Sequence, residues 1–244
     1  MDPTTLFFEV FEALPRQGPG TRECAARALA ACELPPTPRI LDLGCGGGGQ
    51  TLHLASLTEG AIVAVDSHEP LVSKLRAAAE GRGLSDRIDA RVADMAALPP
   101  GAFDLVWSEG ALYNLGFPRA LDVCAEQLRP GGFLVFTEAI WRSDDPPAPV
   151  RAAFADYPGM GNAADVRRHL AAGPWELVLA FDLPDAAWWS EFYGPMEARI
   201  EALRQEHAED PTALAVLDQI AAEPQLHRDH ARHYAYGCFV ARRT

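Results

Sequence analysis

The stretch that decides the fold is Arg39-Ile40-Leu41-Asp42-Leu43-Gly44-Cys45-Gly46-Gly47-Gly48-Gly49. Its first five residues form a short apolar run of the kind that makes a buried strand. The glycines that follow allow a sharp turn and a close approach of the backbone to a ligand, because glycine adopts conformations that other residues avoid. Residues 50–57 then predict a helix, so the stretch is a strand, a glycine-rich turn and a helix in succession.

Strand-like and helix-like segments alternate on both sides of this turn. The helix predicted over 117–128 ends at the turn Arg129-Pro130-Gly131-Gly132. The predicted strands of this part are 39–43, 61–65, 88–92, 103–107 and 133–136. Strands separated by helices of crossover length form a doubly wound parallel sheet with right-handed connections. The sequence therefore predicts an α/β fold that binds its ligand at the carboxyl ends of the strands.

The two ends of the chain differ from this alternating part. Apolar residues at helical spacing predict a helix over 4–14. A second helix is capped by Thr21 and broken by the prolines of residues 35–38. The later part is mostly helical, with two further strands predicted at 175–181 and 234–240.

The charge balance bears on possible partners. The 244 residues hold 21 basic and 34 acidic side chains, a net charge of −13. This charge disfavours a nucleic-acid substrate or an anionic membrane surface. Lys74 is the single lysine, which excludes any mechanism that needs two.

Cysteine usage and hydropathy indicate the compartment. The five cysteines are scattered without a C-x-x-C pair, which is typical of buried thiols in a reducing environment. The first residues lack the positive charge of a signal peptide, and no apolar run reaches the ~20 residues of a membrane span. We therefore expect a cytoplasmic protein.

Three acidic residues lie where the predicted strands end. Asp42 stands two residues before the first glycine, Asp66 closes the second strand, and Asp94 follows the third strand beside Met95. Any one of them alone is as consistent with a helix N-cap as with a binding site. Together with the glycine turn they indicate a nucleoside site, in which an acid at the Asp66 position binds ribose hydroxyls. Asp42 would repel a pyrophosphate, which counts against a dinucleotide.

At this point the sequence resembles the class I S-adenosylmethionine-dependent methyltransferases, in particular the type that includes the ubiquinone and menaquinone C-methyltransferases. A closer likeness is to poorly characterised bacterial members, through residues 16–20, Trp107-Ser108-Glu109-Gly110-Ala111 and Tyr234-Ala235-Tyr236-Gly237. The family motifs are Leu41-Asp42-Leu43-Gly44-Cys45-Gly46-Gly47-Gly48, Val65-Asp66, Val92-Ala93-Asp94-Met95, Phe103-Asp104-Leu105-Val106 and Leu128-Arg129-Pro130-Gly131-Gly132.

The resemblance implies a fold and a set of cofactor contacts. The fold is a Rossmann-like seven-stranded sheet of order 3-2-1-4-5-7-6, in which the last two strands make an antiparallel hairpin. A single domain, 1–244, would contain an N-terminal helical lid (1–35), a cofactor-binding core (38–140) and a helical cap over the acceptor (184–233). The implied cofactor is S-adenosylmethionine, with S-adenosylhomocysteine as product. Its expected contacts are Arg16, Asp42, Gly44, Cys45, Gly46, Gly48, Asp66, Ser67, Asp94, Met95 and Ser108.

Several classes of methyl acceptor are excluded because the sequence lacks the motifs of the enzymes that methylate them. Ser108-Glu109-Gly110-Ala111 lacks the Asn/Asp-Pro-Pro-aromatic motif of nucleobase amino-methyltransferases and the Pro-Cys nucleophile of cytosine-C5 enzymes. The single lysine excludes the Lys-Asp-Lys-Glu tetrad of ribose 2′-O-methyltransferases. Arsenite methyltransferases rely on several cysteines near the methyl donor, and here only Cys45 is well placed. A small organic acceptor remains.

Catalytic roles are assigned to residues after the fourth strand. Glu109 is the predicted general base, with Tyr113 and Asn114 orienting the acceptor, although Glu109 fits equally well as the cap of a turn. Arg16 lies beside Gln17 in a lid-like loop and would pair with the cofactor carboxylate or an acidic acceptor, unless that loop is a surface turn.

Aromatic and histidine residues of the later part add two further predictions. Trp188 or Tyr193 is expected in the acceptor pocket. Three histidines, His227, His230 and His233, recur at three-residue spacing, and we interpret them as a polar helix face, with no metal site.

Two alternatives stay open. One is an NAD-dependent oxidoreductase that uses the same glycine turn, and the other is a non-catalytic S-adenosylmethionine-binding protein. The expected partners are a small-molecule methyl acceptor and at most a second copy of the chain, as a monomer or homodimer.

Overall fold

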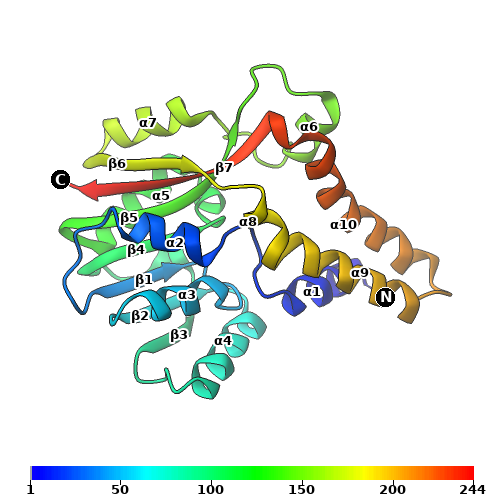
Figure 1. The fold of residues 1–244 in the computed structure, drawn as a ribbon, viewed down its shortest axis with the longest axis horizontal. Coiled ribbons are helices and arrows are strands. Elements are labelled where there is room, and N and C mark those ends of the chain that lie inside the picture. Colours follow the sequence, from blue (N-terminus) through cyan, green and yellow to red (C-terminus); the bar gives the residue numbers. More distant parts are fainter. Residues whose placement is uncertain (1) are drawn as a thin grey trace.

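The computed structural model describes residues 2–244 and contains a seven-stranded sheet in the order β3-β2-β1-β4-β5-β7-β6 (Figure 1). This order confirms the predicted α/β fold. The strands are Arg39–Leu43 (β1), Ala61–Asp66 (β2), Ile88–Val92 (β3), Phe103–Glu109 (β4), Leu128–Trp141 (β5), Trp175–Asp182 (β6) and Tyr234–Arg243 (β7).

Helices precede, separate and follow these strands. The α-helices are Pro3–Ala13 (α1), Arg22–Leu29 (α2), Gly49–Leu57 (α3), Glu69–Gly81 (α4), Phe117–Gln127 (α5), Ala148–Ala153 (α6), Ala163–Ala172 (α7), Ala186–Trp188 (α8), Gly194–Glu206 (α9) and Pro211–His230 (α10). Shorter turns of helix are Met95–Ala97, Leu112–Leu115, Trp189–Tyr193 and Ala231–His233. Both predicted N-terminal helices are confirmed, and Thr21 caps α2 as expected by accepting a hydrogen bond from the Cys24 amide.

The pairing of the strands separates a parallel part from an antiparallel edge. Strand β1 pairs in parallel with β2 and β4, and β4 pairs in parallel with β5. Strand β7 is antiparallel to both β5 and β6, which confirms the predicted hairpin. One prediction was wrong, because the turn Arg129-Pro130-Gly131-Gly132 lies inside β5. Buried Leu128 already pairs with Phe103, and an irregularity in the register follows it.

Adjacent residues of the central strands pack against opposite helical layers. Ile40 belongs to the apolar cluster that includes residues of α2, α3 and α4, whereas Leu41 packs with residues of α5 and α7. A sheet covered on both faces needs strands that are largely apolar, and residues 40–43, apolar except for Asp42, are all buried.

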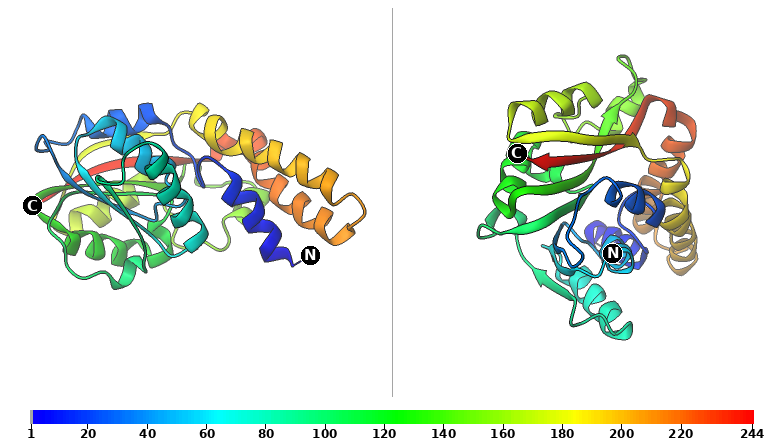
Figure 2. Two further views of the ribbon diagram at one scale, coloured as in Figure 1. Left: turned by 90° about the horizontal axis from the view of Figure 1, so that it is seen from below. Right: turned by 60° about the vertical axis from the view of Figure 1, so that its left-hand side comes forward.

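A third apolar cluster joins α1, α9 and α10 beside the carboxyl ends of the parallel strands. Both Figure 1 and Figure 2 show these three helices side by side, away from the helices that cover the sheet. The buried residues Leu6, Ile200 and Leu217 carry the packing, one from each helix. The helices therefore cover the edge of the sheet where the chain was predicted to bind its ligand.

Polar contacts fasten α1 to the rest of the molecule. Lys74 of α4 donates hydrogen bonds from Nζ to the carbonyl oxygens of Glu12 (2.6 Å) and Leu14 (2.7 Å). Gln17 donates to the Phe11 carbonyl (3.0 Å) and accepts a hydrogen bond from the Gly47 amide (2.8 Å). These bonds satisfy carbonyls at the end of α1, where a helix has no internal donors.

The Lys74→Met variant tests this fastening. We expect it to lower the free energy of unfolding by about 1–2 kcal/mol, because two charge-assisted hydrogen bonds are lost from a partly exposed group. Urea unfolding measures the change, with Arg82→Met at the exposed end of α4 as a control for the lost charge. If the two variants are equally stable, Lys74 does not hold α1.

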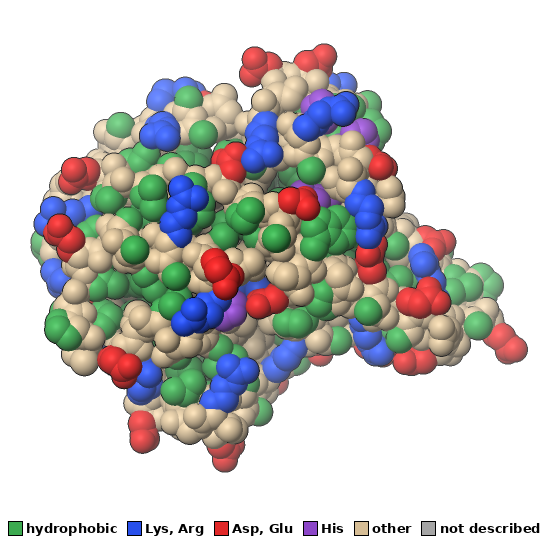
Figure 3. All heavy atoms as spheres, viewed as in Figure 1, with side chains coloured by type: hydrophobic (Ala, Val, Ile, Leu, Met, Phe, Trp, Pro, Cys, Tyr) green, Lys and Arg blue, Asp and Glu red, His purple; other side chains and the backbone are tan. Residues whose placement is uncertain are grey.

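The remaining features of the fold are the charges on its surface and the hydropathy of its helices. On the face shown in Figure 3, acidic and basic side chains are interspersed with apolar ones. Across residues 2–244, no helix is both long enough and apolar enough to cross a membrane.

Candidate active site

A cavity of about 1270 Å³ lies at the carboxyl ends of the central parallel strands, beneath α1 and α10. Most of the predicted site residues line it, although they come from distant parts of the chain. These are Arg16, Asp42, Gly44, Cys45, Gly46, Asp66, Ser67, Asp94, Met95, Glu109, Tyr113 and Asn114.

Gly48 and Ser108, both predicted cofactor contacts, are not among the described residues that line the cavity. The Ser108 hydroxyl is fully buried and donates a hydrogen bond to the Leu43 carbonyl (2.8 Å), which links β4 to β1. Gly48 has a φ of 86°, and a Cβ there would lie 2.2 Å from Cδ1 of Leu75. The structure gives both residues a role in packing.

The glycine turn brings backbone to the cavity. Gly44 has a φ of 71°, and an added Cβ would lie 2.3 Å from Cβ of Ala111. The Gly46 amide donates to Asp66 Oδ2 (2.9 Å), and the other Asp66 oxygen accepts from the His68 amide (2.9 Å). Asp66 therefore holds the turn and the start of α4 together while it faces the cavity.

Asp94 forms the helix cap that the sequence left open as one of two interpretations. Its carboxylate accepts a hydrogen bond from the Ala96 amide (2.8 Å) and caps the turn Met95–Ala97. Asp94 and Met95 also line the cavity. A cap and a ligand contact are thus compatible at this position.

Asp42 is the most deeply buried acid of the site, with 1% of its surface exposed. It accepts a hydrogen bond from the Thr51 hydroxyl (2.6 Å). Burial raises its pKa to about 7, and the charge of Glu109 adds to this rise. The Thr51 bond and the Arg16 charge oppose the rise, because both favour the ionised form.

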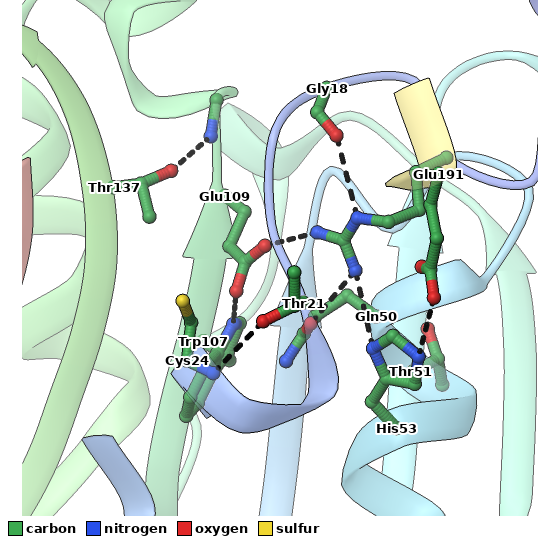
Figure 4. A network of polar contacts seen from close by, with 12 residues as sticks. Gly18, Thr21, Cys24, Gln50, Thr51, His53, Trp107, Glu109, Thr137 and Glu191 are labelled. Carbon is green, nitrogen blue, oxygen red and sulfur yellow. Dashed lines mark hydrogen bonds and ion pairs between the residues drawn. The ribbon is translucent and has the colours of Figure 1, made fainter. Parts of the chain in front are cut away.

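Arg16 and Glu109, which both line the cavity, form an ion pair, and Figure 4 shows Glu109 with its polar contacts. Arg16 is 5% exposed and Glu109 is 11% exposed, which contradicts a surface turn at Arg16. Trp107 donates from Nε1 to the second Glu109 oxygen (2.9 Å). Both carboxylate oxygens of Glu109 therefore already accept hydrogen bonds.

Gln50 lies on the other side of the Arg16 guanidinium. Its Oε1 accepts from Arg16 Nη1 (3.0 Å), and Nδ1 of His53 lies 3.5 Å from the same nitrogen (Figure 4). The buried Nε2 of Gln50 has no hydrogen-bond partner within residues 2–244. Since Gln50 lines the cavity, this amide is a donor next to the space where a ligand would lie.

The half of the cavity under the late helices is aromatic. Trp188 and Tyr193 line it, as predicted. Glu223 of α10 also lines it, and sequence reasoning missed this residue. A signal was present, because Gln219, Ala222, Glu223 and Leu226 recur at helical spacing and all face the cavity.

The polar helix face predicted for the histidines was wrong for His227. It is 3% exposed and stacks on Trp188, with ring centroids 4.2 Å apart. Its Nδ1 lies 3.1 Å from the Tyr234 hydroxyl and its Nε2 lies 3.2 Å from Asp185 Oδ1. Burial lowers the pKa of His227 below its usual range. Among the residues described, no three histidine, cysteine or acidic side chains gather as metal ligands would.

Comparison with known proteins identifies similar molecules. Residues 40–132 match the model of a methyltransferase domain. The fold is similar to that of an S-adenosylmethionine-dependent methyltransferase from Thiobacillus denitrificans, which was crystallised with S-adenosyl-L-homocysteine. The TM-score is 0.86 at 20% sequence identity, and the match covers 100% of both chains.

Two curated relatives methylate different atoms, according to their names. A 24-methylenesterol C-methyltransferase from Oryza sativa is 27% identical over 70% of this chain and 51% of its own length. A ubiquinone biosynthesis O-methyltransferase from Xanthomonas euvesicatoria is 38% identical over 39% of this chain and 41% of its own length. The chain thus spans about half the length, or less, of these two relatives.

Proposed function

We propose that the chain is a class I S-adenosylmethionine-dependent methyltransferase and that it transfers a methyl group from S-adenosylmethionine to a small organic molecule. The observation that carries the proposal is the gathering of Asp42, Asp66 and Asp94 around the glycine turn in one cavity. Such a set offers acceptors for an ammonium, for ribose hydroxyls and for an adenine amino group.

The residues present fit this cofactor. The absence of a side chain at Gly44 keeps the backbone open to the ligand, and the unpaired Gln50 amide is a donor for its carboxylate. Asp42 would hold the amino group, Asp66 the ribose, and Asp94 with Met95 the adenine. NAD, the cofactor of the alternative oxidoreductase, would bring a pyrophosphate close to Asp42. The negative charges of the two groups would repel each other.

The chemistry then requires mainly positioning. S-adenosylmethionine supplies a methyl group on a sulfonium, which is a good leaving group. Orientation of two reactants supplies about 7–11 kcal/mol in well-aligned reactions. We propose that Tyr113 and Asn114 orient the acceptor at the end of β4. Glu109 is paired with Arg16 and bonded by Trp107, and we propose that it positions Arg16. Its role as general base stays a prediction.

Ligand-induced stabilisation tests the proposed function. S-adenosylhomocysteine should raise the melting temperature and NAD should not, since a ligand at 100 times its Kd adds about 2.7 kcal/mol of stability. Stabilisation by NAD alone would favour an oxidoreductase. Binding of S-adenosylhomocysteine without methyl release over a broad panel of acceptors would favour a non-catalytic binding protein.

Asp42 should make cofactor binding depend on pH. In the free protein the pKa of Asp42 is about 7, and a bound ammonium would require its ionised form. Binding therefore releases a proton, so affinity falls as pH drops below 7, by up to about tenfold per pH unit. Calorimetry with S-adenosylhomocysteine between pH 6 and pH 8 measures the slope.

The matched variant is Asp42→Asn, which should bind more weakly at pH 8 and show a flatter profile. Asp86→Asn removes an exposed acid and should leave the profile unchanged. Equal slopes in the unchanged protein and in Asp42→Asn would rule Asp42 out as the ammonium partner.

A further inference from the structure

The aromatic half of the cavity, under the late helices, is also lined by one acid, Glu223. Tyr193, which is 1% exposed, donates a hydrogen bond from its hydroxyl to Glu223 Oε1 (3.0 Å). The Tyr193 ring lies 4.7 Å from that of Phe192 and 5.6 Å from that of Trp188, between centroids. Tyr236 extends the wall, 5.2 Å from Trp188. The carboxylate of Glu223 is thus held in place at an aromatic wall.

Within residues 2–244, the cavity wall offers no basic side chain that is free to pair with an anionic acceptor. Of the cavity-lining residues within 2–244, Arg16 is the one arginine, and no lysine or histidine is among them. The Arg16 guanidinium is already bound by Glu109 and Gln50. Lys74 is engaged at the end of α1. A carboxylate or phosphate in the aromatic half would therefore lie beside Glu223 without a compensating charge.

A cation beside Glu223 would instead offset the cost of desolvating its carboxylate. Glu223 is open to the cavity, yet protein surrounds it, and this desolvation raises its pKa, against the effect of the Tyr193 bond. A positively charged group beside the carboxylate favours its ionised form. Aromatic faces attract the same kind of group through their electron density.

We propose that the methyl acceptor is an organic molecule with an apolar body and a protonated amine, which Glu223 binds at the wall formed by Trp188, Phe192, Tyr193 and Tyr236. The ammonium has no lone pair, so it serves for recognition and the methyl group goes to another, unprotonated atom of the acceptor. This inference rests on the proposed function, because it assigns the acceptor to the space next to the cofactor. Glu223 is a recognition residue in this arrangement, and the selectivity comes from charge: amines bind, neutral analogues bind less tightly, and anions are rejected.

The test is equilibrium binding to the full chain saturated with S-adenosylhomocysteine. The probes share a phenyl group and differ in charge: benzyltrimethylammonium and 2-phenylethylamine are cations, 2-phenylethanol is neutral and 3-phenylpropanoate is an anion. We expect the two cations to bind at least about tenfold more tightly than the alcohol, and the anion to bind most weakly, because one contact of this kind is worth about 1.4 kcal/mol.

Two variants assign the preference to one side chain. Glu223→Gln keeps the size of the residue and should reduce cation affinity about tenfold while leaving the alcohol unaffected. Glu209→Gln removes an exposed acid from the segment between α9 and α10 and should change neither. The comparison of probes on the unchanged protein does not depend on how either variant folds.

The outcomes separate the two proposals. Failure to bind S-adenosylhomocysteine would overturn the proposed function. Binding of S-adenosylhomocysteine together with a preference for the anion, no detectable cation binding at millimolar concentration, or an unchanged cation preference in Glu223→Gln would overturn the assignment of an amine acceptor.

Discussion

The Gly44→Ala variant should bind S-adenosylhomocysteine at least about 100-fold more weakly than the unchanged protein. The backbone at Gly44 has a φ of 71°, which costs a residue with a Cβ about 1–2 kcal/mol. The added Cβ would also lie 2.3 Å from Cβ of Ala111, a short side chain that cannot rotate away. Relief of this overlap costs about 1–3 kcal/mol and moves the turn against which the ligand lies. Together these costs correspond to about two orders of magnitude in affinity.

Calorimetry measures this loss, and the melting temperature shows whether the variant remains folded. Gly81→Ala is the matched control, because a Cβ there would meet no atom within 4 Å. It should bind S-adenosylhomocysteine normally. Near-normal binding by a folded Gly44→Ala variant would mean that the glycine turn does not face the cofactor.

Asp66→Ala should weaken S-adenosylhomocysteine binding by about 100-fold or more. The carboxylate would accept hydrogen bonds from both ribose hydroxyls, and charge-assisted bonds of this kind are worth about 1.5–3 kcal/mol each. The substitution also removes the acceptor for the Gly46 and His68 amides, each 2.9 Å away, so the turn loses support.

Two related variants distinguish binding from support. Asp66→Asn keeps one oxygen acceptor and should bind with intermediate affinity. Asp86→Ala removes an exposed acid and should bind normally. If calorimetry shows that Asp66→Ala loses less than about tenfold in affinity for S-adenosylhomocysteine, Asp66 does not bind the ribose.

The sheet could be predicted from the sequence because its signals are local. Short apolar runs ending at glycine or aspartate mark the strands, and residues 39–43 and 61–66 form strands as the pattern indicates. The start of β5 was missed, because a Pro-Gly-Gly segment has the composition of a turn. There the burial and pairing of Leu128 outweigh local preference.

The gathering of Asp42, Asp66 and Asp94 in one cavity was also predictable, because parallel strands bring their carboxyl ends to one edge. The contacts between distant segments were not. Arg16 and Glu109 are 93 residues apart, and nothing near either one indicates that they pair. His227 is buried because of how α10 packs on Trp188, which helical spacing alone does not show. Glu223 shares a helical spacing with Gln219 and Leu226, but that spacing does not show that their common face meets the cavity.

The single lysine gives the protein its own chemical reporter of helix opening. An amine-reactive reagent can acylate Lys74 only while its nitrogen is released from the carbonyl oxygens of Glu12 and Leu14. The rate of acylation at this one side chain, followed by mass spectrometry, therefore measures how often α1 lifts away from α4. Phe7 and Phe11 of that helix line the cavity, so the same rate tells how often the bound molecules have a way in or out.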